Sequence, residues 1–148
     1  SKGYIIAQEF LPKVSKGDVR VILMNGKILE ENGQKAIIRR VSSDKTEFRS
    51  NLSLGAKAKK AQLTPEIEHI VSLTAPKLIR DGLFFVGLDI VDDKLIEINV
   101  LSPGGLNYCE DIGFPGFTDT VIDALERKME YLKYYKNSLS NRALATMD

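Results

Sequence analysis

One stretch, residues 84–105, constrains the fold of this chain more than any other. It reads FFVGLDIVDDKLIEINVLSPGG, two apolar runs rich in Val, Ile, Leu and Phe that are joined by the polar triplet at residues 92–94. This composition is typical of a largely buried β-hairpin. Because an unpaired buried charge costs several kcal/mol, the acid and amide side chains within the two runs need partners. They are Asp89, Glu97 and Asn99.

The length of the turn decides which of these side chains meet. Side chains two apart on a strand share a face. If residues 92–94 all form the loop, Asp89 lies directly opposite Glu97, at a Cβ separation of about 5 Å where like charges repel. Three-residue hairpin loops are common. A two-residue turn would instead place Asp89 opposite Ile96 and separate the carboxylates. In either register, alternation along the second strand puts Leu95, Glu97 and Asn99 on one face.

In the first register, two carboxylates and an amide oxygen converge on one face of the hairpin. A hard divalent cation would relieve their repulsion, and an incomplete shell of oxygen ligands suits Mg²⁺, with Mn²⁺ as an alternative. The spacing alone leaves another reading open, in which these are ordinary acids on a solvated strand face.

Composition restricts the class of protein. The 148 residues are one domain's worth, 43% of them are hydrophobic and the net charge is +1, so nothing global indicates a nucleic-acid or membrane partner. No apolar run approaches the ~18–20 residues that cross a bilayer. A single cysteine, Cys109, rules out an intrachain disulfide. We therefore expect a reducing, cytoplasmic setting.

The remaining pattern predicts an α+β fold, a mainly antiparallel sheet flanked by helices. Strands are predicted, with Asn25-Gly26 as a hairpin turn, over residues 4–11, 19–24, 27–29 and 36–41. Residues 42–60 read as an irregular, functional loop.

Two amphipathic helices complete the prediction. The first begins at the N-cap Thr64 and ends near Gly82, with an apolar stripe of Ile67, Ile70, Val71 and Leu78. The second covers residues 118–135, with an apolar stripe of Val121, Ile122, Leu125, Met129 and Leu132. We assign residues 1–135 to one lobe and expect the polar tail, residues 136–148, to fray.

Five sequence tags occur in order along most of the chain, from about residue 5 to residue 127. They are QEFLP (8–12), GDVRV (17–21), FRSNLSLG (48–55), FVGLDI (85–90) and EINVLSPGGL (97–106). Together they resemble the C-terminal, large ATP-grasp lobe of bacterial-type glutathione synthetase. The resemblance implies ligation of an amino acid to a peptide carboxylate through an acyl phosphate made from ATP. The substrates it implies are γ-glutamylcysteine and glycine.

The same resemblance implies roles for residues in the first half of the chain. Gln8, Glu9, Phe10 and Leu11 match the hinge that contacts adenine, and Asp18 matches an acid near the ribose. Arg20 and Arg40 would lie near the phosphates, although Arg39 competes with Arg40 because the spacing to Arg49 differs by about one residue. Near the carboxylates of the acceptor peptide, the resemblance places Arg49 and Asn51.

In the second half, the resemblance makes Asp89, Glu97 and Asn99 the Mg²⁺ ligands, which agrees with the first hairpin register. Ser102, Gly104 and Gly105 form a turn around the acceptor glycine, where glycine lets backbone N–H groups approach an anion. His69 and Cys109 read as structural, because neither has a catalytic partner in the pattern.

Two parts of an ATP-grasp enzyme are not found upstream in this sequence, namely the lysine strand with its glycine loop and the domain that opens these proteins. We therefore expect the isolated chain to bind nucleotide weakly and not to turn over. Two rival readings stay open, a ligase for another acid–amine pair and a non-catalytic nucleotide-binding fragment. The sequence also leaves self-association undecided.

Overall fold

The fold is built on one antiparallel sheet with the strand order β6-β5-β1-β7-β8, and β2 pairs with the far end of β1. The computed structural model describes residues 3–5, 7–41, 57–114 and 116–148. Every strand pair in the sheet is antiparallel, which confirms the predicted fold class. The strands are β1 (Asp18–Met24), β2 (Lys27–Ile28), β5 (Ile37–Val41), β6 (Lys57–Lys60), β7 (Phe85–Val91) and β8 (Lys94–Asn99).

Two tight turns of the same composition follow β1. Asn25-Gly26 joins β1 to β2, as predicted, with φ values of 49° and 74°. Asn32-Gly33 joins the short strands β3 (Glu30–Glu31) and β4 (Gln34–Lys35), with φ values of 51° and 75°. Positive φ at both central residues is what an Asn-Gly hairpin turn requires. The second hairpin was not predicted, although it carries the same signal.

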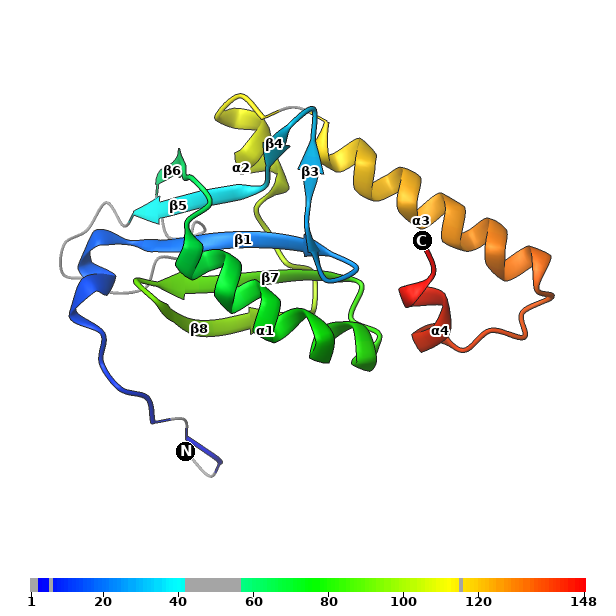
Figure 1. Ribbon diagram of the computed structural model, residues 1–148, viewed down its shortest axis with the longest axis horizontal. Helices are drawn as coiled ribbons and strands as arrows, with labels where there is room; N and C mark the ends of the chain where they lie inside the picture. Colours follow the sequence, from blue (N-terminus) through cyan, green and yellow to red (C-terminus); the bar gives the residue numbers. More distant parts are fainter. Residues whose placement is uncertain (1–2, 6, 42–56, 115) are drawn as a thin grey trace.

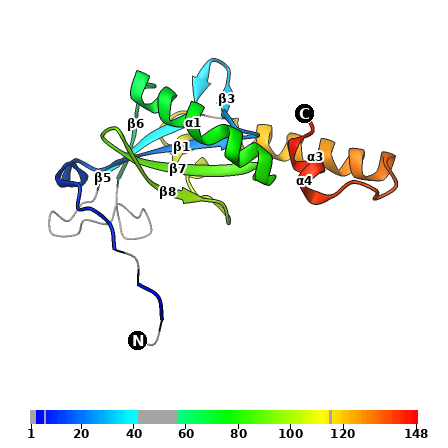
Figure 2. The same ribbon diagram turned by 60° about the horizontal axis from the view of Figure 1, so that its bottom comes forward.

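Helix α1 (Pro65–Asp81) covers one face of the sheet, as Figures 1 and 2 show. It begins where predicted, since the Thr64 hydroxyl accepts a hydrogen bond from the Ile67 amide, and Gly82 ends it at φ 74°. The buried side of the helix packs on Val19, Val21 and Leu23 of β1. That side consists of Ile67, Ile70, Val71 and Leu78, the predicted stripe.

The opposite face of the sheet is covered by α2 (Leu106–Asp111) and α3 (Phe117–Tyr134). Ile22 and Ile38 meet Cys109 and Phe117 in this second core. In α3 the buried side is Phe117, Val121, Ala124 and Lys128. Of the predicted stripe, Val121 is buried and Leu132 half-buried, but the prediction was wrong for Ile122, Leu125 and Met129, which are exposed.

The N-terminal segment and the stretch before α1 also differ from expectation. Residues 7–11 are not in a strand and are mostly exposed, so the predicted first strand is wrong; the 3-10 helix η1 (Pro12–Lys16) follows. At the end of the expected loop, residues 57–60 form the edge strand β6 on β5. Residues 42–56 lie outside the described residues.

The C-terminal tail is ordered by a buried lysine. Helix α4 (Asn141–Thr146) lies beside the far half of α3, which extends past the end of the sheet (Figure 1). The Lys128 ammonium donates to the carbonyls of Leu144 and Ala145, both at 3.1 Å, and to that of Met147. It also lies 4.3 Å from the centre of the Phe84 ring. The expectation of a frayed tail was wrong.

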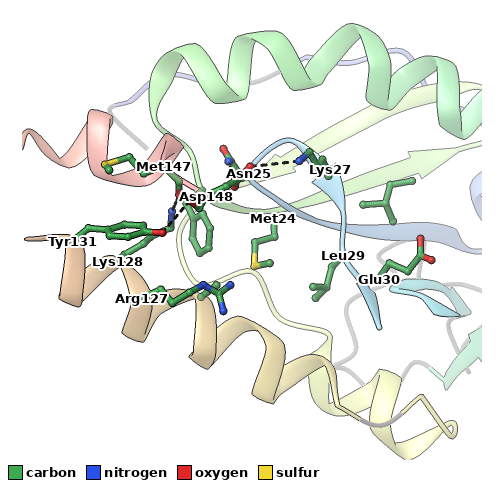
Figure 3. A pocket seen from close by; sticks show the side chains of 13 residues that line it. Met24, Asn25, Lys27, Leu29, Glu30, Arg127, Lys128, Tyr131, Met147 and Asp148 are labelled. Carbon is green, nitrogen blue, oxygen red and sulfur yellow. Dashed lines mark hydrogen bonds and ion pairs between the residues drawn. The ribbon is translucent and has the colours of Figure 1, made fainter. Parts of the chain in front are cut away.

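The final residue closes the same corner. Asp148 accepts from the Asn25 amide and, at its main-chain oxygen, from the Tyr131 hydroxyl at 3.0 Å. These side chains border a cavity of about 420 Å³ between β2, α3 and the tail (Figure 3). We call this group of contacts, centred on Lys128, the C-terminal latch.

Candidate functional site

Four buried charges form a ladder across β5, β1 and β7, on the face of the sheet that α2 and α3 share. The strand register places Asp18 opposite Arg40 and Arg20 opposite Asp89. These four side chains, the charge ladder, belong to residues that are only 2–7% exposed. Alternation along the strand explains the arrangement, since Asp18 and Arg20 share one face of β1 while Val19 and Val21 face α1.

Every charge in the ladder is hydrogen-bonded to an opposite charge. Arg20 grips both oxygens of Asp89, with Nη2 to Oδ2 at 2.8 Å, and donates from Nη1 to the Gly104 carbonyl at 2.7 Å. Arg40 grips both oxygens of Asp18, with Nε to Oδ1 at 3.0 Å, and reaches Asp89 Oδ2 at 2.9 Å. Two-pronged arginine–carboxylate pairs of this kind are strong and fix geometry.

Burial and pairing shift the pKa values of Asp18 and Arg40 in opposite directions. Burial raises the pKa of the Asp18 carboxyl above its ordinary value, and the hydrogen bond from Arg40 opposes that rise. Burial would lower the pKa of Arg40, but its bonds to Asp18 and its attraction to Asp89 outweigh burial and raise it. Each group therefore depends on its partner to remain charged inside the protein.

Asp18 faces inward, which changes the interpretation of this residue. Its carboxylate is buried and both of its oxygens accept from Arg40. A side chain in this position orients an arginine and does not present itself to a ribose, so the ribose contact implied by the resemblance does not fit this geometry.

The hairpin that carries the predicted metal ligands combines a short turn with a bulge. Val91 pairs with Lys94, so the turn has two residues, which is the second of the two alternatives left open by the sequence. A register shift between Asp89 and Ile90 then leaves Ile96 unpaired and restores Asp89 to its position opposite Glu97. The predicted pairing of the two carboxylates is therefore confirmed, by a different route.

The bulge also decides which side chains of β8 face the ladder. Leu95 packs into the core beneath α1, so it does not share a face with Glu97 and Asn99 as predicted. Asn99 does point to the ladder, since its amide donates to Asp89 Oδ2 at 3.1 Å. One extra residue thus separates a core position from the polar positions that follow it.

The donor groups at this corner fit a hard divalent cation. Glu97 is exposed, and its side chain makes no hydrogen bond or ion pair within the described part of the chain, although it lies opposite Asp89. The amide oxygen of Asn99 likewise accepts no bond from described residues. In the same ranges, no three His, Cys, Asp or Glu side chains cluster as metal ligands. Asn99 is therefore needed to complete a set of three oxygen donors.

A tight turn covers the ladder, and a glycine that the sequence reading missed lies beneath it. Gly105 has φ 133°, and Gly104 supplies the carbonyl that Arg20 reaches, while Ser102 is exposed. A Cβ atom at Gly87 would meet Arg20 Cδ at 3.1 Å and Nε at 3.2 Å. Glycine inside an otherwise apolar strand was the available signal for this close approach.

The residues expected to contact adenine border a cavity at the edge of the sheet. Gln8, Glu9, Phe10 and Leu11 line a space of about 370 Å³ against the start of β8. The Gln8 side chain donates to the Ile96 carbonyl at 3.4 Å. The wall is largely apolar, as the flat face of a purine would require. This cavity adjoins the strand that carries Glu97.

The structure separates Arg39 from Arg40. Arg39 lines a different cavity, together with Thr64 and Ile67 on the α1 side of the sheet. Arg40 points into the charge ladder, so it is the arginine that belongs to this site. Arg49 and Asn51 lie outside the described residues.

Comparison with known proteins places this chain in a family. The family model described as "Prokaryotic glutathione synthetase, ATP-grasp domain" matches residues 1–113. The chain belongs to this family.

Its curated relatives include several glutathione synthetases of bacteria. The chain is 37% identical over 121 residues to that of Prochlorococcus marinus and 40% identical over 121 residues to that of Parasynechococcus marenigrum. It is 37% identical over 123 residues to that of Bradyrhizobium diazoefficiens. These matches cover 82–83% of this chain but 37% of each relative, so the chain spans little more than a third of their length.

None of the described helices is both long and apolar enough to cross a membrane.

Proposed function

We propose that this chain supplies the ATP- and Mg²⁺-binding part of a glutathione synthetase. The reaction joins γ-glutamylcysteine to glycine and converts ATP to ADP and phosphate. The observation that carries the proposal is the meeting of Asp89, Glu97 and Asn99 beside two arginines, on a hairpin whose turn end borders the edge cavity. Phosphoryl transfer depends chiefly on positioning and charge neutralisation, and this corner offers both.

Each described group has a role in the proposed reaction. The backbone and side chains of residues 8–11 hold adenine in the edge cavity. Asp89, Glu97 and Asn99 hold Mg²⁺, which when bound neutralises the charge of the ATP phosphates. Arg20 and Arg40 orient the transferring phosphoryl group from the adjoining strands.

The acceptor side of the proposed site uses other residues. Arg49 and Asn51 hold the carboxylates of γ-glutamylcysteine. Its cysteinyl carboxylate attacks the γ-phosphorus of ATP and ADP leaves, which gives an acyl phosphate. The amine of glycine, held at the turn of Ser102, Gly104 and Gly105, then attacks the acyl carbon, and phosphate leaves as the amine loses a proton.

The proposal extends to setting and assembly in two respects. We place the protein in the cytoplasm, where a single buried thiol such as Cys109 stays reduced. We also expect the rest of the active site to come from protein segments like those that make up the remaining length of the relatives.

A chimera tests the proposed reaction. Residues 5–127 replace the matched segment of the Prochlorococcus relative, and products are identified after incubation with ATP, γ-glutamylcysteine and glycine. We expect glutathione, and we expect its loss in the Glu97→Gln chimera. If a folded chimera that binds ATP released ADP only with another acid or amine, the substrate assignment would be wrong.

A further inference from the structure

The charge ladder and the proposed cation both need the Asp89 carboxylate. Its Oδ1 atom accepts from Arg20, and its Oδ2 atom accepts from Arg20 and Asn99 and forms an ion pair with Arg40 at 2.9 Å. An ionised carboxylate offers about four acceptor positions. Asp89 therefore cannot bind a cation through Oδ2, or through both oxygens, without giving up hydrogen bonds that now hold the ladder together.

The two arginines would respond differently to that loss. Arg40 has a second carboxylate, because Asp18 accepts from both its Nε and its Nη2. Arg20 has Asp89 as its only carboxylate partner among the described residues, and its remaining bond goes to the neutral Gly104 carbonyl. A cation on Asp89 thus leaves Arg40 paired and Arg20 without a counter-charge.

The charge balance of the corner leads to the same result. The ladder holds two positive and two negative side chains, and Glu97 adds one negative charge at its edge. A divalent cation changes this total from −1 to +1. The surplus lies between the cation and Arg20, where an anion such as a polyphosphate would restore balance.

We propose that Arg20 is a stored anion-binding group, held by Asp89 until a divalent cation takes that carboxylate, and that Asp18 is the positioning residue that keeps Arg40 in place meanwhile. This inference rests on the proposed function, because it needs the cation at Asp89. It predicts that cation and polyphosphate each increase the affinity for the other.

Arginine Nε–H signals in NMR spectra of the ¹⁵N-labelled chain test this directly. Arg20→Lys and Arg40→Lys identify the two resonances, and MgCl₂ is then added without nucleotide. We expect the Arg20 signal to shift or disappear as its bond to Asp89 opens, while the Arg40 signal, held by Asp18, stays in place. Titration with KCl at equal ionic strength is the control, and Glu97→Gln should weaken the response.

Three outcomes would overturn the inference. If backbone amides of β7 and β8 report bound Mg²⁺ while the Arg20 signal stays unchanged, Arg20 is not stored and the metal site still stands. If both arginine signals respond equally, Asp18 does not fix Arg40. If Mg²⁺ changes no signal in β7, β8 or the ladder, the metal assignment of the proposed function fails as well.

A variant isolates the role of Asp18. In Asp18→Asn, we expect Mg²⁺ to change both arginine signals, and Asp18→Glu should restore the difference between them. A merely structural role would lower stability in Asp18→Asn but leave the Arg40 signal insensitive to Mg²⁺, which would contradict the positioning role.

Discussion

The two ends of β1 bury positive charge in different ways. At the Asp18 end, the arginines of the charge ladder are paired with carboxylates, and in our proposal a cation competes with Arg20 for one of them, Asp89. At the Met24 end, Lys128 of the C-terminal latch donates to main-chain carbonyls of α4 and of the residue that follows it, and these carbonyls carry no charge that a cation could take over. A charge buried against another charge can exchange partners, whereas a charge buried against fixed dipoles holds a structure together.

Breaking the ladder should have the largest effect on stability. Asp18→Asn removes the carboxylate that neutralises Arg40 inside the protein, and we expect a loss of about 3–5 kcal/mol in the free energy of unfolding. Urea denaturation measures it. The double variant Asp18→Asn/Arg40→Met, which leaves no buried charge at that pair, should recover part of the loss. An equal or larger loss in the double variant would contradict this account.

The latch should come next. Lys128→Met keeps the apolar stem but removes the ammonium donor from three carbonyls, of which, among the described residues, only that of Leu144 still accepts a bond, from the Met147 amide, and we expect a loss of about 2 kcal/mol in urea denaturation. Arg127→Met is the matched control, since Arg127 is exposed and makes no bond within the described residues. It should change stability by less than about 0.5 kcal/mol. Similar losses in the two variants would show that the carbonyl contacts contribute little.

The Cys109 thiol is buried without an opposite charge beside it among the described residues, so it measures chiefly the effect of burial. Burial raises the pKa of the Cys109 thiol from 9.0 to about 11. The fold therefore favours the neutral thiol, so stability is unaffected below pH 9 and falls between pH 9 and 11, as the thiol of the unfolded chain ionises first. We expect this to amount to roughly 2 kcal/mol and to be absent in Cys109→Ala. Parallel stability–pH curves for the two proteins would contradict it.

The contact between Gly87 and Arg20 gives a smaller effect. Gly87→Ala places a methyl group against Arg20, which is held in place by Asp89, and we expect a loss of about 1 kcal/mol in the thermal unfolding of the chain. Gly104→Ala, where the added atom meets nothing within 4 Å, should be nearly neutral. A larger loss in Gly104→Ala than in Gly87→Ala would mean that the Arg20 side chain moves aside at little cost.

Much of this architecture could be predicted from local signals. Thr64 and Gly82 mark the ends of α1 because each satisfies backbone groups that the helix itself leaves open. The position of Asp89 opposite Glu97 was predicted for a three-residue loop, whereas the structure reaches it through a two-residue turn and a bulge. The bulge at Ile96 depends on how β8 packs, and no residue of the hairpin sequence predicts it.

Other features depend on contacts far apart in the sequence. Whether α3 turns Val121 or Leu125 inward depends on the surface it meets, because apolar residues occupy both sides of that helix. The order of the tail depends on Lys128, which reads as an ordinary surface lysine until α4 docks on it. The mutual pairing of Arg20, Arg40, Asp18 and Asp89 was not predicted, since it arises from the register of three strands.

The smallest effect on stability is expected at Glu97, which we propose as a metal ligand. Glu97 is exposed and its side chain makes no hydrogen bond or ion pair within the described ranges, so Glu97→Gln should change the free energy of unfolding by less than about 0.5 kcal/mol. A larger loss on urea denaturation would mean that Glu97 supports the fold and has no need of a cation.

Calorimetric titration of this chain with a non-hydrolysable ATP analogue, with and without Mg²⁺, tests the central claim most directly. We expect binding that strengthens with Mg²⁺ in the native chain and loses that dependence in Glu97→Gln, while the variant melts at the same temperature. Equal Mg²⁺ dependence in the two proteins would contradict the assignment of Asp89, Glu97 and Asn99 as the metal site.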